Sequence, residues 1–181
     1  MATGASFSCV CKKVTITFFV NKPRLVMECC CVDCLDRICW TCEASGRTVP
    51  DAYLKKEKAP IVYEFPNNFE VSGKEHLGFV RLREGADSLM CVAKCCNTQM
   101  LIDYPGYEGN MVSCYPEFVD LTNCADTKPT MRSWIKDWPD EDVAKLSPLP
   151  GWYIKEMTEQ GPVFDGTGDW GSVITDFGTA A

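Results

Sequence analysis

The stretch "MECCCVDCLDRICWTCEASG", residues 27–46, holds six of the thirteen cysteines of this 181-residue chain. Cysteines at this density are metal ligands, redox thiols, disulfide partners or small buried residues. Cys29, Cys31 and Cys34 form a Cys-x-Cys-x-x-Cys pattern that leaves an expected strand and enters an expected helix. Three thiols this close can converge on one ion, and thiolate sulfur suits zinc. The pattern predicts a zinc site with three protein ligands and an open position, with a cluster of structural thiols as the alternative.

The same stretch offers a second arrangement, two Cys-x-x-Cys pairs separated by only four residues. Zinc ribbons separate such pairs by about 15–20 residues, so this pairing is not favoured. On a helix expected at 33–45, Cys39 and Cys42 lie at positions i and i+3, on the face that packs inward. We predict that both are core residues. Cys30 receives no role from this pattern.

Two further cysteine pairs lie outside the stretch. Cys9 and Cys11 form a Cys-x-Cys just before an expected strand, where alternate residues share a face, as two ligands of one metal would. Two buried small residues would give the same pattern. Cys95 and Cys96 are adjacent, and adjacent side chains of a strand point apart. Asn97 follows them, and asparagine is the commonest residue besides glycine in the left-handed turn that a metal-binding cysteine often precedes.

Three isolated cysteines are expected to be buried small hydrophobic residues: Cys91, Cys114 and Cys124.

Composition excludes several classes of protein. The net charge of −7 and isoelectric point near 4.8 argue against nucleic-acid binding, which requires a basic face. No apolar run approaches the roughly 20 residues of a membrane span. The N-terminus lacks a secretory signal, so we expect the cytoplasm or another reducing compartment, with organelle import after removal of a precursor segment left open.

The pattern of short apolar segments predicts a mainly β fold. Segments rich in β-branched and aromatic residues alternate with turn-forming residues, and only 33–45 and 139–146 have helical character. The expected strands are 14–20, 24–27, 61–65, 79–83, 100–104 and 118–121.

The C-terminal part has a different composition. Six of the thirteen glycines and five spaced aromatic residues fall in the last 31 residues, which are also acidic. We therefore divide the chain into a domain at 1–148 and a Gly-rich acidic arm at 149–181. The arm either wraps its own domain or docks into a larger protein assembly.

Taken in order, the cysteine motifs resemble those of the glutathione-dependent formaldehyde-activating enzyme family, which includes centromere protein V. That family has a Cys-x-Cys, then a Cys-x-Cys-x-x-Cys, then a Cys-x-x-Cys-Gly-Thr turn, matched here by Cys9/Cys11, Cys29/Cys31/Cys34 and "CCNT" at 95–98. The segment 127–138 is similar to the strand and tryptophan that close the family domain. The resemblance covers residues 1 to about 148.

The resemblance implies two packed antiparallel sheets in a tent-like arrangement, few short helices, and one or two zinc ions. Cys9, Cys11, Cys95 and Cys96 would form a closed structural site. Cys29, Cys31 and Cys34 would form the open catalytic site, where the thiolate of glutathione adds to formaldehyde, a carbon–sulfur lyase reaction in reverse. Arg37 or Arg47 could bind the carboxylates of glutathione.

This chain departs from the family pattern at three positions. Ala93 stands where the first cysteine of the last pair belongs, so Cys95 is the nearby substitute. Asn97 replaces the glycine of the turn, and Cys30 stands where the family often has histidine. The degenerate pair and the acidic arm motivate a second hypothesis, a non-catalytic zinc-stabilised accessory subunit. A redox-sensing thiol protein is a third, motivated by Cys30, Cys39 and Cys42.

Overall fold

The computed structural model describes residues 4–82, 86, 88–149 and 153–154, and it has two β-sheets and few short helices. A three-stranded sheet has the order β1-β2-β5 and is antiparallel. Its strands are β1 (Ser6–Ser8), β2 (Thr15–Phe18) and β5 (Phe69–Ser72). The mainly β fold with two sheets is confirmed.

The larger sheet has the order β11-β10-β3-β4-β9-β8-β7-β6. Its strands are β3 (Leu25–Cys29), β4 (Ile61–Pro66), β6 (Leu77–Val80), β7 (Leu89–Ala93), β8 (Thr98–Asp103), β9 (Met111–Cys114), β10 (Met131–Ser133) and β11 (Tyr153–Ile154). The expectation of wholly antiparallel sheets is wrong at one edge, because β10 runs parallel to both β3 and β11. β10 reaches that edge through a long connection, which permits a parallel pairing that a tight hairpin does not.

The expected strands overlap observed strands except at 118–121, and 79–83 shares only Phe79 and Val80 with β6. There, the chain forms a 3-10 turn, η3 (Pro116–Phe118), followed by irregular backbone. Proline at the start of this turn fixes φ and removes a backbone donor, which favours a turn over a strand. Most strands that the sequence did not indicate have only three to five residues, which gives little alternation to detect.

Helices are short, and one of them positions the cysteine-rich stretch. α1 (Val32–Ala44) lies within one residue of the helix predicted at 33–45. α3 (Asp140–Val143) falls inside the predicted segment 139–146 but is a single turn, and α2 (Asp51–Leu54) was not predicted. The remaining 3-10 turns are η1 (Lys74–His76), η2 (Pro105–Tyr107) and η4 (Ile135–Asp137). Among the described residues, no helix has the length and hydropathy to cross a bilayer.

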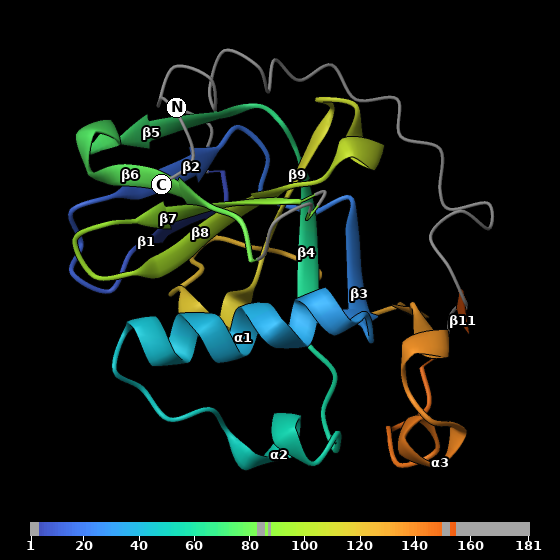
Figure 1. The fold of residues 1–181 in the computed structure, drawn as a ribbon. Coiled ribbons are helices and arrows are strands. Elements are labelled where there is room, and N and C mark those ends of the chain that lie inside the picture. The colour runs from blue at the N-terminus through green and yellow to red at the C-terminus, as the bar shows by residue number, and fades with distance from the viewer. Residues whose placement is uncertain (1–3, 83–85, 87, 150–152, 155–181) are drawn as a thin grey trace.

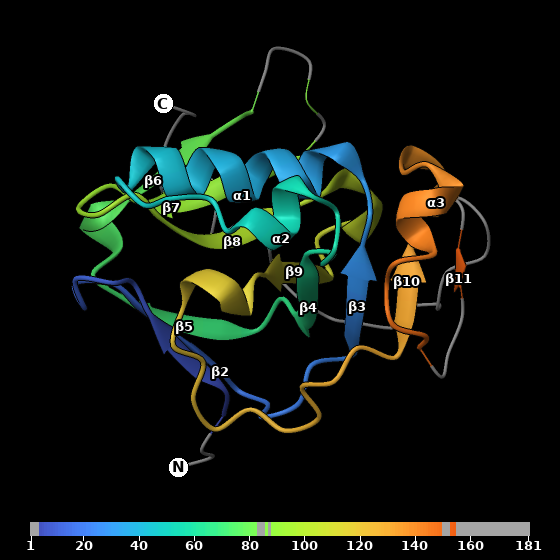
Figure 2. The same ribbon diagram turned by 90° about the horizontal axis from the view of Figure 1, so that it is seen from below.

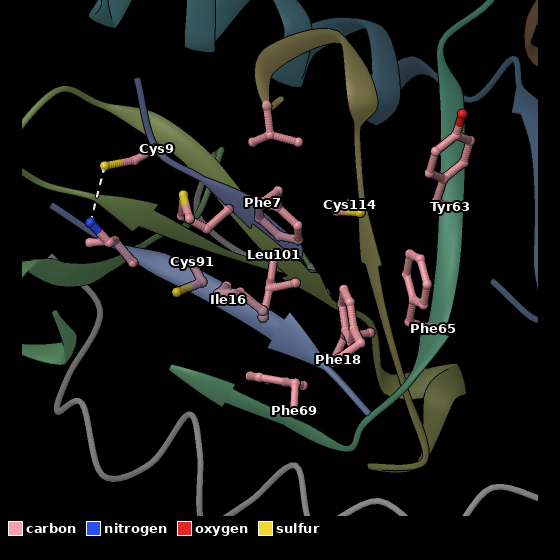
Figure 3. Close-up of a cluster of buried hydrophobic side chains, with 14 of the residues drawn as sticks. Phe7, Cys9, Ile16, Phe18, Tyr63, Phe65, Phe69, Cys91, Leu101 and Cys114 are labelled. Carbon is pink, nitrogen blue, oxygen red and sulfur yellow. Dashed lines mark hydrogen bonds between the residues drawn. The ribbon is translucent and has the colours of Figure 1, made fainter. Parts of the chain in front are cut away.

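The elements form three layers (Figures 1 and 2). The three-stranded sheet covers one face of the larger sheet, and α1 lies across the opposite face. Figure 3 shows the core between the sheets, where Phe18 of β2 stacks on Phe65 of β4 with ring centroids 4.0 Å apart. Phe7, Ile16 and Leu101 complete this contact from both sheets.

Side chains on the other face of the large sheet form a second core beneath α1. In β7, Cys91 points between the sheets, whereas Met90 and Val92 point toward α1. They pack in the cluster that contains Ile38 and Cys42 of the helix. This packing fixes α1 on the sheet and holds its N-terminus beside the end of β3, where the cysteine triplet begins.

The start of the acidic arm joins the large sheet. Tyr153 and Ile154 pair with Arg132 and Ser133 of β10. The remainder of the predicted arm beyond Ile154 lies outside the described residues, so its role as a wrapping or docking segment stays a prediction.

Candidate metal centres and the adjoining cavity

Four cysteines from two distant segments meet at one end of the three-stranded sheet. Cys9 and Cys11 follow β1, Cys95 and Cys96 lie in the turn between β7 and β8, and the four Sγ atoms all lie within 4.8 Å of one another. The Sγ atom of Cys9 is 3.6 Å from that of Cys11 and 4.0 Å from that of Cys95. Sulfurs about 2.3 Å from a central ion at tetrahedral positions would be about 3.8 Å apart. The four sulfurs could therefore hold a metal ion, and the fourth sulfur of the group, which the sequence left uncertain, belongs to Cys95.

The backbone around Cys9 curls to present both sulfurs on one side. Lys12 adopts a left-handed conformation with φ of 63°, and its N–H donates to the carbonyl of Cys9 at 2.8 Å. The N–H of Val14 donates to the Sγ of Cys9 at 3.3 Å (Figure 3). Cys9 and Cys11 therefore converge because of a turn, and the strand alternation expected from the sequence is not what aligns them.

A second turn explains how two adjacent cysteines reach the same cluster. Side chains of neighbouring strand residues would point apart, but Cys95 and Cys96 lie in the turn and not in a strand. Asn97 takes the left-handed conformation predicted for it, with φ of 52°. Its side-chain amide donates to the carbonyl of Ala44 at 2.7 Å, which ties this turn to the last turn of α1.

Hydrogen bonds make the sulfurs of this cluster unequal. Burial raises the pKa of Cys96, but bonds from Thr98 and from the Cys11 region outweigh it and lower the pKa to about 6. The Thr98 hydroxyl lies 3.1 Å from the Cys96 sulfur. Burial and the neighbouring thiols raise the pKa of Cys9 and that of Cys95. One thiolate is thus favoured even before an ion adds its own charge.

The cysteine triplet forms the second cluster, where β3 meets α1. Cys29 ends β3, Cys31 is the N-cap residue of α1, and Cys34 lies in its first turn. Their Sγ atoms all lie within 4.8 Å of one another, so this group too could hold a metal ion. The N–H of Cys34 donates to the Cys31 sulfur at 3.3 Å, which satisfies a helix N-terminus that a serine or aspartate would normally cap.

Cys34 is the favoured thiolate of the triplet. Hydrogen bonds from Cys29 and Cys31 lower its pKa well below the usual thiol range, and the charge of Arg37 and a hydrogen bond from Tyr115 add to this effect. The Tyr115 hydroxyl donates to the Cys34 sulfur at 2.9 Å. Hydrogen bonds with its two partners, followed by burial, raise the pKa of Cys31 well above that range. The cluster therefore concentrates negative charge on one sulfur.

A cavity of about 280 Å³ opens directly beside the triplet, a size suited to a small molecule. Its wall combines the three cysteines with aromatic, apolar and charged side chains. The residues beyond the cysteines are Met27, Val32, Asp33, Arg37, Val62, Ser88, Ile102, Tyr104, Tyr107, Ser113, Tyr115, Trp134 and Asp137.

The cavity distinguishes the two arginines that the sequence proposed for carboxylate binding. Arg37 lines the cavity, forms an ion pair with Asp33 at 3.7 Å, and donates to the hydroxyl of Ser88. Arg47 instead lies over the ring of Phe118 and bonds to Ser45 at the end of α1. Only Arg37 of this pair lies at the cavity.

Cysteines outside the two clusters fall into two groups. Cys42 is buried against the sheet as predicted, whereas Cys39 is half-buried, which corrects its assignment to the core. A position three residues away on a helix turns by about 60°, enough to reach the edge of the buried face. Cys91 and Cys114 are buried as expected, and Cys124 is only half-buried. Cys30 is fully buried in a small separate cluster with Trp138 and Leu146.

Sequence reasoning missed the tyrosines of the cavity and a buried carboxyl behind them. Glu64 of β4 is fully buried, and the hydroxyl of Tyr107 donates to it at 2.7 Å. A single charged residue inside the otherwise apolar run "IVYEFP" was the available indication, because a carboxyl in a buried strand needs a partner.

Comparison with known proteins adds no family to this description. No family model, curated protein or solved structure matches the chain.

Proposed function

We propose that the chain is a zinc protein with one structural site and one thiol-binding site of the carbon–sulfur lyase type. The observation that carries this proposal is the cavity of about 280 Å³ lined by Cys29, Cys31 and Cys34, whose three sulfurs lie together. Four cysteines complete a tetrahedral shell, whereas three leave a position for an exogenous ligand. The substrates proposed are glutathione and formaldehyde.

The residues of both clusters fit zinc by the chemistry of their donor atoms. All seven are cysteines, and thiolate sulfur favours zinc over the hard cations calcium and magnesium. Zinc at the triplet would act as a Lewis acid that favours the thiolate form of a bound thiol.

The side chains of the cavity would bind and orient the substrate. The guanidinium of Arg37 is the cation available to a carboxylate of glutathione, and its Nε atom has no hydrogen-bond partner among the described residues. The apolar and aromatic wall would exclude water from the added carbonyl compound. Tyr115 donates to Cys34 and would keep negative charge on that sulfur.

The test compares zinc-loaded wild-type protein with two cysteine variants of α1. Wild type should bind two zinc ions per chain and accelerate formation of S-hydroxymethylglutathione. Cys31→Ala should retain one zinc and lose the acceleration, by about 100-fold or more. Cys39→Ala, on the same helix but outside the cluster, should behave as wild type. Fully loaded wild type that gives only the uncatalysed rate would refute the proposed activity.

One observation favours a second candidate, a non-catalytic accessory subunit. Pairing of β11 with β10 places Tyr153 and Ile154, near the start of the acidic arm, on the large sheet. Removal of residues 155–181 keeps β11 and deletes the rest of the arm. The accessory role predicts that the native complex in extracts of the source cells becomes smaller by size-exclusion chromatography after this deletion. An unchanged elution volume would count against this role.

A further inference from the structure

Glu64 is a buried carboxyl on the face of β4 that forms the cavity. Alternation along β4 sends Tyr63 and Phe65 into the core between the sheets. Val62, two residues before Glu64 on the same face, lines the cavity. Glu64 has no solvent exposure, so it lies behind the cavity wall and not in contact with bulk water.

Tyr107 connects this carboxyl to the cavity. Its hydroxyl donates to Oε1 of Glu64 at 2.7 Å, and its side chain is part of the cavity wall. The second oxygen, Oε2, has no hydrogen-bond partner among the described residues. A proton can therefore pass between the cavity and Glu64 through one phenol group.

The fold gains little from a carboxyl at this position. A buried carboxyl with one unpaired oxygen costs free energy that an apolar side chain would not. Burial raises the pKa of Glu64 to about 7; the hydrogen bond from Tyr107 opposes this and the charge of Cys34 adds to it. The neighbouring strands contribute no titratable group at this register, since Glu64 lies opposite Ser113 of β9 and Leu25 of β3.

We propose that Glu64, acting through Tyr107, is the proton acceptor of the cavity: it takes the proton that a thiol gives up on binding beside the cysteine triplet, and later returns it. This inference rests on the proposed thiol-binding function. It adds to that function a residue pair outside the metal clusters.

The proton and electron balance is complete without an oxidant or reductant. The thiol proton moves to the oxygen of Tyr107 while the phenolic proton of Tyr107 moves to Glu64. The sulfur lone pair then forms the carbon–sulfur bond, and the carbonyl π electrons move onto oxygen. The former carbonyl oxygen takes a proton from the hydroxyl of Tyr107. Tyr107 then takes a proton back from Glu64, so both residues return to their starting state.

The experiment counts the protons released when glutathione binds to the zinc-loaded protein. Calorimetry in buffers with different ionisation heats gives this number at each pH. Above pH 7, wild type should release fewer protons than Glu64→Gln, by up to about one per glutathione bound. Well below pH 7, Glu64 already holds a proton, so the two proteins should release equal numbers. Glutamine keeps the acceptor for Tyr107, so a purely structural role predicts no difference at any pH.

Two further variants keep the test decisive. Tyr107→Phe removes the hydroxyl that joins Glu64 to the cavity and should match Glu64→Gln in proton release. It also provides the test of the relay if Glu64→Gln does not fold. Tyr63→Phe loses a hydroxyl from the neighbouring position on the opposite face of β4 and should match wild type. In the lyase assay, Glu64→Gln should lose about 100-fold in rate, the lower range for proton-transfer catalysis.

The outcomes distinguish the proton relay through Tyr107 and Glu64 from the thiol-binding function on which it rests. Equal proton release by wild type, Glu64→Gln and Tyr107→Phe at every pH, with glutathione bound, would overturn the relay and leave the thiol site standing. Absence of glutathione binding to zinc-loaded wild type would instead overturn the proposed function, and the relay with it.

Discussion

The four-sulfur cluster joins segments that are far apart in the chain, with Cys9 and Cys95 separated by 86 residues. The three-sulfur cluster is local, running from the last residue of β3 to the first turn of α1. Cys11 and Cys95 of the first cluster are exposed, and none of its four residues lines the cavity. Cys29 and Cys34 of the second are buried, yet both residues line the cavity.

This difference shows that exposure at the surface and openness to a ligand are separate properties. Four sulfurs can fill all four positions of a tetrahedral site, which leaves no position for a further ligand even when the site is near solvent. Three sulfurs leave one direction free, and in this chain a cavity adjoins the three cysteines. The cluster that closes a long loop should therefore contribute to stability, and the local cluster to chemistry.

The largest expected effect comes from placing the same substitution in each cluster. Cys9→Ser removes a buried sulfur from the cluster that joins the two sheets, and loss of the proposed metal should lower the free energy of unfolding by more than about 4 kcal/mol. Cys31→Ser should cost about 1 kcal/mol, because serine still caps α1. Denaturant unfolding of zinc-loaded proteins measures both. Equal losses would remove the distinction between a structural and a chemical cluster.

The second effect concerns Glu64, the buried carboxyl behind the cavity wall. Burial raises the folded-state pKa of Glu64 to about 7, so the folded protein binds this proton more tightly than the unfolded chain. The stabilisation is present below the ordinary pKa of 4.5 and is lost as pH rises through about 7. Relative to Glu64→Gln, wild type should lose about 3 kcal/mol of unfolding free energy over this range. Parallel stability curves from pH 4 to 8 would contradict the prediction.

A third comparison removes one hydroxyl from each cluster. Tyr115→Phe deletes the hydrogen bond to the Cys34 sulfur, and Thr98→Val deletes the one near the Cys96 sulfur. Hydrogen bonds to charged groups contribute about 1.5–3 kcal/mol, so loss of the Tyr115 bond should raise the pKa of Cys34. The Thr98 change should shift the Cys96 pKa less, because Cys96 is less buried. Thiolate absorbance against pH in metal-free protein measures both, and a larger shift from Thr98→Val would reverse the interpretation.

The smallest expected effect tests the turn that brings Cys95 and Cys96 together. Asn97→Ala places an ordinary residue at φ of 52° and removes the bond to Ala44, which should cost about 1–2 kcal/mol. Asn97→Gly relieves the backbone cost and loses only the side-chain bond, so its loss should be smaller. Thermal unfolding distinguishes them. If glycine is the more destabilising of the two, the backbone argument fails for this turn.

The grouping of the three triplet cysteines was predictable from sequence because their spacing is local within one motif. Cys29, Cys31 and Cys34 needed only one strand end and one helix start, both visible in the pattern. The left-handed turn at Asn97 was also predictable, from residue type alone. That both Cys95 and Cys96 join one cluster was not predictable from sequence, because it depends on where β7 ends.

The errors share one physical cause, which is that short elements take their form from packing. The segment 118–121 has strand composition but follows a proline turn beneath α1, where Phe118 is buried without pairing. Cys39 has a helical position near the inward face, yet the width of the contact between α1 and the sheet leaves it half-buried. Neither outcome is encoded in local propensity.

By itself, the sequence determined the mainly β class, the helix that begins in the cysteine-rich stretch, and the grouping of Cys29, Cys31 and Cys34. These follow from local periodicity and spacing. Only the tertiary structure decided that the distant pairs form one four-sulfur group, that a cavity adjoins the triplet, and that Glu64 lies behind Tyr107. Such features depend on which strands become neighbours, and strand pairing is a non-local choice made by burial of the whole core.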